Sequence, residues 1–306
     1  MKDIDEKALQ VSETCKGTCL KRRVGEGSFV GLKTIHNVPE EQIQWLKHLY
    51  AYRYAVSFAE GKSVLDAGCG TGYGVHELST KATNTIAIDI WKEGTYYCHQ
   101  EHCKEAVFLT ASVLNVPFSD NSFDLVVSFQ VIEHIDPGMV TNYLEEIRRV
   151  LKNNGIFLVS TPNRRLRLLP FQKPWNPDHK KEYDAKELES MIKKVFENVE
   201  TLGLFAKKDA YSVEYYRVKQ KPFVVYAINP TISIAKRILP ACFIDALMKF
   251  AAKRRKSGQR SERRKNMSYD FSLKDFHTSR QNLDACIDLY GICIKNEIDL
   301  DADMQH

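Results

Sequence analysis

One short segment of the chain, Val64 to Gly72, combines residue types that suit binding of a nucleotide. It reads V-L-D-A-G-C-G-T-G, so glycines alternate with Cys69 and Thr71 directly after an apolar run. Glycines in a turn after a strand allow backbone N–H groups and a helix N-terminus to approach a ligand without obstruction by side chains. The segment therefore predicts a turn that holds a nucleotide-like ligand.

Two acidic residues accompany this turn. Asp66 precedes the first glycine, and Asp89 follows that glycine by 21 residues, at the end of the next apolar run. A carboxylate at that position can accept hydrogen bonds from both hydroxyls of a ribose. The glycine spacing departs from the dinucleotide fingerprint, because Tyr73 stands where the third glycine should fall. An NAD-dependent oxidoreductase is thus a disfavoured alternative.

The surrounding elements alternate between short apolar runs and longer amphipathic stretches. This rhythm predicts an α/β, Rossmann-like doubly wound and mostly parallel sheet of seven strands, with ligands at the carboxyl ends of the strands. A capping box from Asp184 to Glu187 predicts the start of one helix. We expect strands over 63–67, 85–89, 107–110, 123–129, 155–160, 199–205 and 289–294, and helices over 40–58, 73–80, 92–104, 138–151 and 185–196.

Charge is distributed unevenly over four expected regions. Residues 1–60 form an N-terminal region with a helix over the cofactor site, 61–205 the core, 206–280 a basic insertion between the last two strands, and 281–306 the final strand and tail. Residues 206–280 hold 18 Lys/Arg against 6 Asp/Glu, while the whole chain has a net charge of only +5. A localised positive segment predicts an anionic partner for that segment.

Four blocks in order resemble class I S-adenosylmethionine (SAM) methyltransferases of the type 11-like group. Val64 to Gly72 is similar to the family's first motif, and Ala87 to Ile90 to its second. Val116 to Val126 resembles the "LPF-x-D-x-SFD" segment, and Ser128 to His134 the strand-end "V-x-EH" stretch. The resemblance covers residues 45–205 and the final strand, and it implies a transferase that uses SAM as cofactor.

The resemblance also implies roles for individual residues. Asp66 and the glycine turn would hold the methionyl part of SAM, Asp89 the ribose, and Gln130 would line the methyl-donor pocket. Arg53 is a candidate partner for the SAM carboxylate, or else a surface arginine. The full cofactor set is Arg53, Asp66, Gly68, Cys69, Gly70, Thr71, Gly72, Asp89, Ile90, Ser112, Val113 and Gln130.

Two histidines are candidates for a general base toward an acceptor hydroxyl, because imidazole titrates near neutrality. His134 ends the fourth block. His179 lies in an "NP-x-H-x-x-EY" run that resembles methyltransferases associated with sugar, glycolipid and cell-surface polysaccharide synthesis. Each histidine has an alternative role, a hydrogen bond that only fixes a loop. The implied reaction is methyl transfer to the oxygen of a small-molecule, saccharide or lipid-linked acceptor.

We expect no metal site. The Cys98-His99-x-x-His102-Cys103 pattern contains two pairs at i, i+4 spacing, Cys98 with His102 and His99 with Cys103. On a helix these two pairs point about 100° apart, which does not suit one metal ion. Cys15 and Cys19 offer no nearby histidine. The eight cysteines are scattered, and neither a signal peptide nor a membrane span begins the chain, so a cytoplasmic location without structural disulfides is expected. Hydrophobic content of 43% excludes a wholly disordered chain.

The basic insertion leaves two interpretations open. Apolar residues recur at helical intervals over 230–250, and Lys253 to Lys265 follow with eight basic residues. This pattern fits a peripheral contact with the anionic inner face of a membrane, or a lid over the pocket beside a solvated loop. Nucleic acid is disfavoured, because Lys253 to Lys265 contain no aromatic residue. The alternative function is an inactive membrane- or polyanion-binding protein on the same fold.

Overall fold

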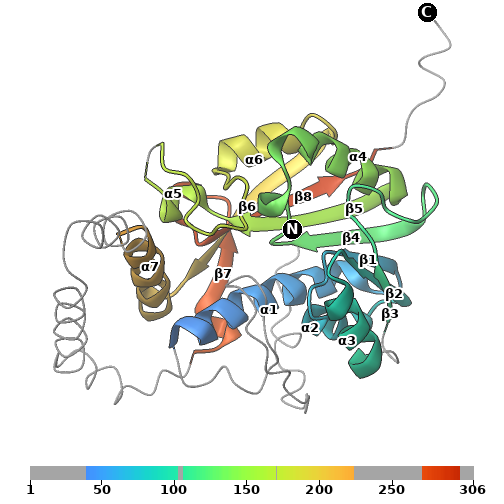
Figure 1. Cartoon of the computed structure of the whole chain (residues 1–306), viewed down its shortest axis with the longest axis horizontal. Helices are drawn as coiled ribbons and strands as arrows, with labels where there is room; N and C mark the ends of the chain where they lie inside the picture. The colour runs from blue at the N-terminus through green and yellow to red at the C-terminus, as the bar shows by residue number, and fades with distance from the viewer. Residues whose placement is uncertain (1–38, 103–105, 170, 224–270, 297–306) are drawn as a thin grey trace, which may run out of the picture.

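The computed structural model describes residues 39–102, 106–169, 171–223 and 271–296. One eight-stranded sheet forms the centre, with the order β3-β2-β1-β4-β5-β8-β6-β7 (Figure 1). The strands are β1 Ser63–Ala67, β2 Asn84–Asp89, β3 Val107–Thr110, β4 Phe123–Phe129, β5 Leu151–Pro162, β6 Asn198–Ala206, β7 Phe276–Ser279 and β8 Asp288–Ile294.

The strands β1 to β5 pair in parallel. β8 runs antiparallel between β5 and β6. Because β1 pairs with β2 on one side and β4 on the other, the chain reverses its direction of progress across the sheet there. Ligands of doubly wound sheets bind in the crevice at such a switch point, so the site is to be sought at the carboxyl ends of β1, β2 and β4.

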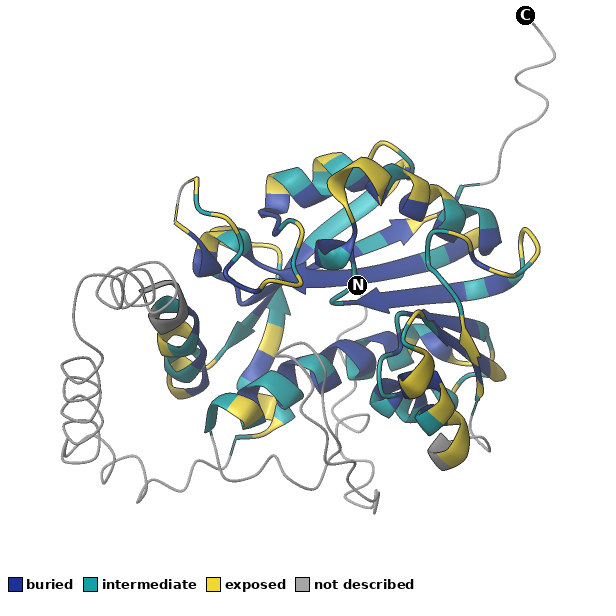
Figure 2. Cartoon of the chain, viewed as in Figure 1, coloured by how far each residue is buried: buried dark blue, intermediate teal, exposed yellow. Residues whose placement is uncertain are grey.

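Helices cover both faces of the sheet (Figure 1). They are α1 Pro39–Ala59, α2 Tyr73–Ser79, α3 Lys92–His102, α4 Val140–Val150, α5 Arg164–Arg167, α6 Ala185–Ile192 and α7 Lys208–Phe223. Buried residues of α4 and α6 pack on one face, against Leu65, Val126 and Phe157. Residues of α1 and α7 pack on the other, against Val64 and Leu158. The central strands β4 and β5 are consequently buried along most of their length (Figure 2).

The α/β class and the mostly parallel sheet with a returning final strand are confirmed, but the predicted number of seven strands is wrong, and the final strand β8 is antiparallel. The eighth strand, β7, pairs antiparallel with the outer edge of β6. It lies inside the predicted insertion over 206–280, which also contains α7. With four residues, only one of them apolar, β7 carries almost no periodic signal, and its pairing with β6 defines it as a strand.

Other boundaries shift by a few residues. The predicted capping box is confirmed: the Asp184 side chain accepts from the Glu187 N–H, and Glu187 returns a bond to the Asp184 N–H. The helix that it starts ends at Ile192, four residues earlier than predicted. β5 begins at Leu151 where a helix C-cap and turn was predicted, and Asn154 adopts a left-handed φ of 60° within it.

None of the described helices is long and apolar enough to cross a bilayer. The apolar and basic stretches over 230–265, as well as Cys15 and Cys19, lie outside the described residues. The four-region division of the chain therefore stays a prediction.

Candidate active site

The glycine turn joins β1 to α2 and has a backbone that only glycines can adopt without strain. Gly68, Gly70 and Gly72 have φ angles of 102°, 56° and 75°. A Cβ on Gly68 would lie 2.3 Å from Val131 Cγ2, and one on Gly72 would lie 2.9 Å from Cys98 Sγ. A Cβ on Gly70 would meet nothing within 4 Å. The turn is therefore tightly packed at both ends and open at its middle glycine.

Asp66 lies beneath this turn at the end of β1 and is completely buried. The hydroxyl of Tyr52, on α1, donates to Asp66 Oδ2 at 3.0 Å. The other oxygen, Oδ1, is buried without a hydrogen-bond partner among the described residues. Burial raises the pKa of Asp66 to about 7; the Tyr52 bond opposes this rise and the charge of Asp89 adds to it. Oδ1 of this carboxylate thus lacks a donating partner among the described residues.

Asp89, at the end of β2, holds the turn from the other side. Its Oδ2 accepts from the Gly70 N–H at 2.8 Å, and its Oδ1 accepts from the Trp91 N–H at 2.9 Å. Each oxygen retains acceptor capacity for a further donor. Ile90 beside it is 76% exposed, so its side chain is accessible at the carboxyl edge of the sheet.

Gln130 ends β4 in a left-handed conformation with a φ of 58°. Its N–H donates to the Ser160 carbonyl at 2.9 Å, and its Nε2 donates to Ser160 Oγ at 3.3 Å. Residues other than glycine adopt such a φ rarely, and the surrounding bonds to β5 keep it in place. The side chain is thus fixed at the switch point between β1 and β4.

His134 and His179 meet beyond Gln130. Their ring centroids lie 4.8 Å apart, with the planes at 87°. His134 Nδ1 lies 3.1 Å from the Asp178 carbonyl oxygen, and His179 Nδ1 lies 2.8 Å from Glu182 Oε1. Both partners accept, so Nδ1 of each ring carries a hydrogen, and each ring has its Nε2 left for another partner. Burial, followed by the nearby His179, lowers the pKa of His134.

Glu133 lies close to the two histidines and is 1% exposed. The Thr161 hydroxyl donates to its Oε2 at 3.0 Å, while its Oε1 is buried without a partner among the described residues. Burial raises the pKa of Glu133 to about 8, and the charges of Glu182 and Asp288 add to the effect. The Glu133 carbonyl accepts from the N–H groups of residues 180 and 181, which fixes the His179 loop against it.

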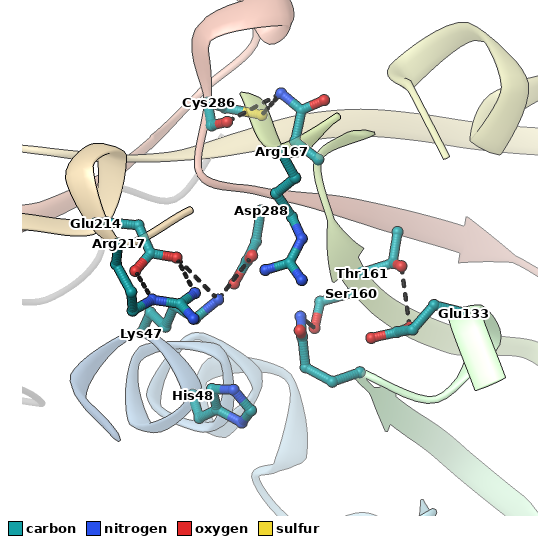
Figure 3. A network of polar contacts seen from close by, with 12 residues as sticks. Lys47, His48, Glu133, Ser160, Thr161, Arg167, Glu214, Arg217, Cys286 and Asp288 are labelled. Carbon is teal, nitrogen blue, oxygen red and sulfur yellow. Dashed lines mark hydrogen bonds and ion pairs between the residues drawn. The ribbon is translucent and has the colours of Figure 1, made fainter. Parts of the chain in front are cut away.

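A network of buried charges lies between α1, α5, α7 and β8 (Figure 3). Lys47 Nζ lies 3.0 Å from Asp288 Oδ1 and 3.8 Å from Glu214 Oε1. Arg167 Nε donates to both oxygens of Glu182, at 3.1 and 3.0 Å. Burial raises the pKa of Glu182, but Arg167 and His179 outweigh it and lower the pKa overall. The charges of this network are therefore compensated, in contrast to Asp66 and Glu133.

Comparison with known proteins decides the family. A model of the methyltransferase domain matches residues 65–159. A probable SAM-dependent methyltransferase of Mycolicibacterium smegmatis is 35% identical over 178 residues, which cover 58% of this chain and 68% of the relative. The chain belongs to the SAM-dependent methyltransferases. A probable SAM-dependent methyltransferase of Mycobacterium tuberculosis H37Rv is 33% identical over 179 residues, which cover 58% of this chain but just under two thirds, 64%, of that protein.

Among solved structures, a putative methyltransferase from Bacillus halodurans is 13% identical with a TM-score of 0.49, over 82% of this chain and all of that one.

The cofactor of this methyltransferase is SAM, and the described residues fit it. Asp66 Oδ1 is a buried acceptor without a donor among the described residues. The ammonium of the methionyl part of SAM would supply that donor. A Cβ at Gly70 would meet nothing within 4 Å, and the Gly70 N–H donates to Asp89, so the middle of the turn is open beside this carboxylate. The predicted roles of these residues, and of Cys69, Thr71, Ser112 and Val113, stay predictions. Cys69 is buried in the turn, and Ser112 Oγ accepts from the Leu114 N–H at 3.1 Å.

Arg53 has a partner in Glu77, and its predicted contact with the SAM carboxylate stays a prediction. Its guanidinium forms an ion pair with Glu77 of α2, and Nη2 donates to Glu77 Oε1 at 3.1 Å. The pair joins α1 to α2 above the turn. A contact of Arg53 with the SAM carboxylate would have to share the guanidinium with Glu77.

Sequence reasoning missed three residues of the site: Tyr52, Glu133 and Glu182. Glu133 and Glu182 stood inside the quoted motifs, as the E of "V-x-EH" and the E of "NP-x-H-x-x-EY", without a role. The spacing of His179 and Glu182 was the available signal for their hydrogen bond. No signal in the sequence pointed to Tyr52, since its bond to Asp66 depends on how α1 packs.

Proposed function

We propose that this methyltransferase transfers the methyl group of SAM to a hydroxyl oxygen of a saccharide or lipid-linked acceptor. One observation carries the proposal: two imidazoles lie together after β4 and β5, each held through Nδ1 by an acceptor, so that Nε2 of each is left for a substrate. A hydroxyl must lose its proton as it attacks a methyl group, and groups with free lone pairs assist that loss.

The buried charges beside the histidines support a polar acceptor. Lys47, Arg167 and Asp288 lie within the body of the protein, each less than one tenth exposed. Buried ionic groups are costly, and a pocket for an aliphatic tail alone has no use for them. The hydroxyl-rich part of a saccharide or a polar lipid head group can hydrogen-bond with such residues. A fatty-acid O-methyltransferase of Mycolicibacterium smegmatis, 31% identical over 113 residues, is consistent with an oxygen acceptor of lipid character.

The protein's own contribution to the reaction is alignment. SAM supplies a methyl group that is already activated by its positive sulfur, so the enzyme must position the acceptor oxygen in line with it and exclude water. Asp66 and the glycine turn would hold the methionyl part, Asp89 the ribose, and Gln130 the position of the methyl group. His134 and His179 would face the acceptor oxygen.

The acceptor can be identified directly. The protein is incubated with methyl-labelled SAM and with fractionated host lipids, glycans and RNA, and the labelled product is analysed by NMR for an O–CH₃ group. We expect label in a glycan or lipid fraction. Label bound to nitrogen or carbon, or in RNA, would contradict the proposal.

Matched variants test the role of the two histidines. His134→Asn and His179→Asn keep an N–H donor near the Nδ1 position but remove Nε2. Each should lower kcat for the identified acceptor by roughly 100-fold or more, the usual contribution of proton transfer, while the affinity for SAM stays close to wild type. Unchanged turnover in both variants would remove the histidines from the mechanism.

We further propose that the basic residues of Lys253 to Lys265 bring the enzyme to an anionic membrane surface. The support is their charge and the adjacent apolar sequence, since these residues lie outside the described part of the chain. Wild-type protein should sediment with vesicles that contain phosphatidylglycerol, less so at high salt, and not with vesicles of phosphatidylcholine alone. Replacement of the eight basic residues by Gln should abolish sedimentation; sedimentation that persists would refute electrostatic binding.

A further inference from the structure

Three residues at the carboxyl ends of β4 and β5 form an arrangement that the transfer of a methyl group does not by itself require. Glu133, His134 and His179 each offer one ligand atom, and these atoms all lie within 4.8 Å of one another. Within the part of the chain that the structure describes, this is the one group of three or more such residues. We propose that Glu133, His134 and His179 bind a divalent transition-metal ion such as Zn²⁺ or Mn²⁺.

The first support is the orientation of the imidazoles. Each ring is held through Nδ1, by the Asp178 carbonyl in one case and by the Glu182 carboxylate in the other. Histidines that bind metals are held in this way, with the second nitrogen bonded to a carboxylate or carbonyl, because the bond fixes the ring and leaves the lone pair toward the ion. Glu182 is itself fixed by Arg167, so the His179 ring has a rigid support.

The second support is independent of the histidines. Glu133 is 1% exposed, and its Oε1 has no partner among the described residues, whereas Thr161 satisfies Oε2. A buried carboxylate oxygen without a donor is costly unless a cation or a proton compensates it. Histidines in the Nδ1–H form cannot donate from Nε2, so they do not satisfy Oε1. A cation between the three groups would satisfy Oε1 and both lone pairs together.

The geometry requires a small closure. An ion with ligand bonds of about 2.0–2.2 Å needs ligand atoms roughly 3–3.5 Å apart, so the most distant pair must approach by about 1.5 Å. Rotations of the side chains can supply this, because the backbone is already fixed by the bonds from residues 180 and 181 to the Glu133 carbonyl, of which the shorter is 2.7 Å. Two imidazoles and one carboxylate suit Zn²⁺, Mn²⁺ or Fe²⁺ better than Mg²⁺, which prefers oxygen ligands.

Three protein ligands leave coordination positions open for an acceptor oxygen. Binding of the ion does not depend on the proposed function, but its use in catalysis does. There, a coordinated hydroxyl would release its proton to solvent more readily. The oxygen then bonds to the methyl carbon as the carbon–sulfur bond breaks, and S-adenosylhomocysteine leaves. In that case the two histidines act through the ion and do not take the proton themselves.

Metal binding is measured without reference to activity. The full chain is stripped with a chelator, dialysed against Zn²⁺ or Mn²⁺, and analysed by elemental mass spectrometry and thermal unfolding. We expect about one ion per chain and a higher Tm when the ion is present, since binding to the folded state stabilises it. A wild-type protein that retains neither ion overturns the proposal.

Variants locate the ion. His134→Asn, His179→Asn and Glu133→Gln should each lower the affinity by more than the roughly 10–100-fold that an outer-shell change costs, and Glu182→Gln should fall within that range. His277→Asn, on the exposed edge strand β7, is the matched control and should bind as wild type. Normal affinity for SAM shows that each variant is folded. If the first three variants bind Zn²⁺ as well as wild type does, the ion lies elsewhere, and that result overturns the assignment.

The outcomes separate this proposal from the proposed function. If the three variants lose the ion and the product is methylated on nitrogen or carbon, the metal-site proposal stands and the proposal of O-methyl transfer is wrong. If the chelator-stripped enzyme retains no ion and still makes an O-methylated product equally well, the metal-site proposal is wrong and the proposed function stands.

Discussion

The ionisation of Asp66 should control the affinity of this enzyme for SAM. Its pKa is about 7 because the carboxyl is buried, and only its ionised form can pair with the ammonium of the cofactor. About one tenth of the carboxyls are ionised at pH 6 and about nine tenths at pH 8, so SAM should bind about ninefold more tightly at the higher pH.

Tyr52→Phe perturbs this equilibrium without touching the carboxyl. The Tyr52 hydroxyl donates to Asp66 Oδ2 at 3.0 Å and thereby lowers the pKa of Asp66. A hydrogen bond to a charged group is worth roughly 1.5–3 kcal/mol, or at least about one pKa unit. Loss of the Tyr52 hydrogen bond should move the pKa of Asp66 from about 7 to about 8. This change weakens SAM binding about fivefold at pH 7 and much less at pH 9.

Calorimetric titration from pH 6 to 9 measures this shift, in buffers of different ionisation enthalpy so that proton release on binding is counted. The cofactor's own titration is the same for both proteins, so the difference between their profiles reports Asp66. Tyr54→Phe, two residues along α1 and without a bond to Asp66, is the control. Superimposable profiles for wild type and Tyr52→Phe, or a wild-type affinity that is flat between pH 6 and 8, would refute the reasoning.

Three further variants test other contacts. Asp89→Ala should weaken SAM binding more than about tenfold, since it removes the proposed ribose acceptor and releases the Gly70 N–H, and calorimetry measures it. Gly70→Ala and Gly61→Ala share a positive φ and open space at Cβ, so each should lose about 1 kcal/mol in denaturant unfolding, but only Gly70→Ala should also weaken SAM binding. Lys47→Met should cost about 3–5 kcal/mol of unfolding free energy, because Asp288 loses its ion pair, and the added change Asp288→Asn should restore part of it.

The cofactor half of the site could be predicted from the sequence because its contacts are local in the chain. The glycine turn lies within one strand–turn–helix unit, and Asp89 follows it after one further strand. The positions of such residues depend on the alternation of elements, which apolar periodicity reveals. The short strand β7 escaped prediction for the opposite reason, since its four residues have no periodic pattern of their own.

The acceptor half depends on contacts between distant segments. Lys47 and Asp288 are 241 residues apart, and Glu133 meets Thr161 across two strands. No spacing in the sequence predicts these pairs, because the first depends on the position of β8 between β5 and β6, and the second on the pairing of β4 with β5. Glu133 Oε1 is left without a partner among the described residues, so a chain without a recognisable metal motif can still contain a candidate metal site.

The residues proposed for the two halves of the site follow a single strand, and this has a mechanistic consequence. Gln130, proposed to line the methyl-donor pocket, comes directly after β4, and Glu133 and His134, proposed for the acceptor side, follow within four residues. β4 is buried between β1 and β5, and the Ser128 hydroxyl donates to the Ala67 carbonyl at 2.6 Å, just before the glycine turn. In the proposed mechanism, the distance from the methyl donor to the acceptor groups is therefore set by a buried strand at the centre of the sheet. Differences in acceptor can then arise in the loops and helices after β5 without disturbing the alignment on which the transfer depends.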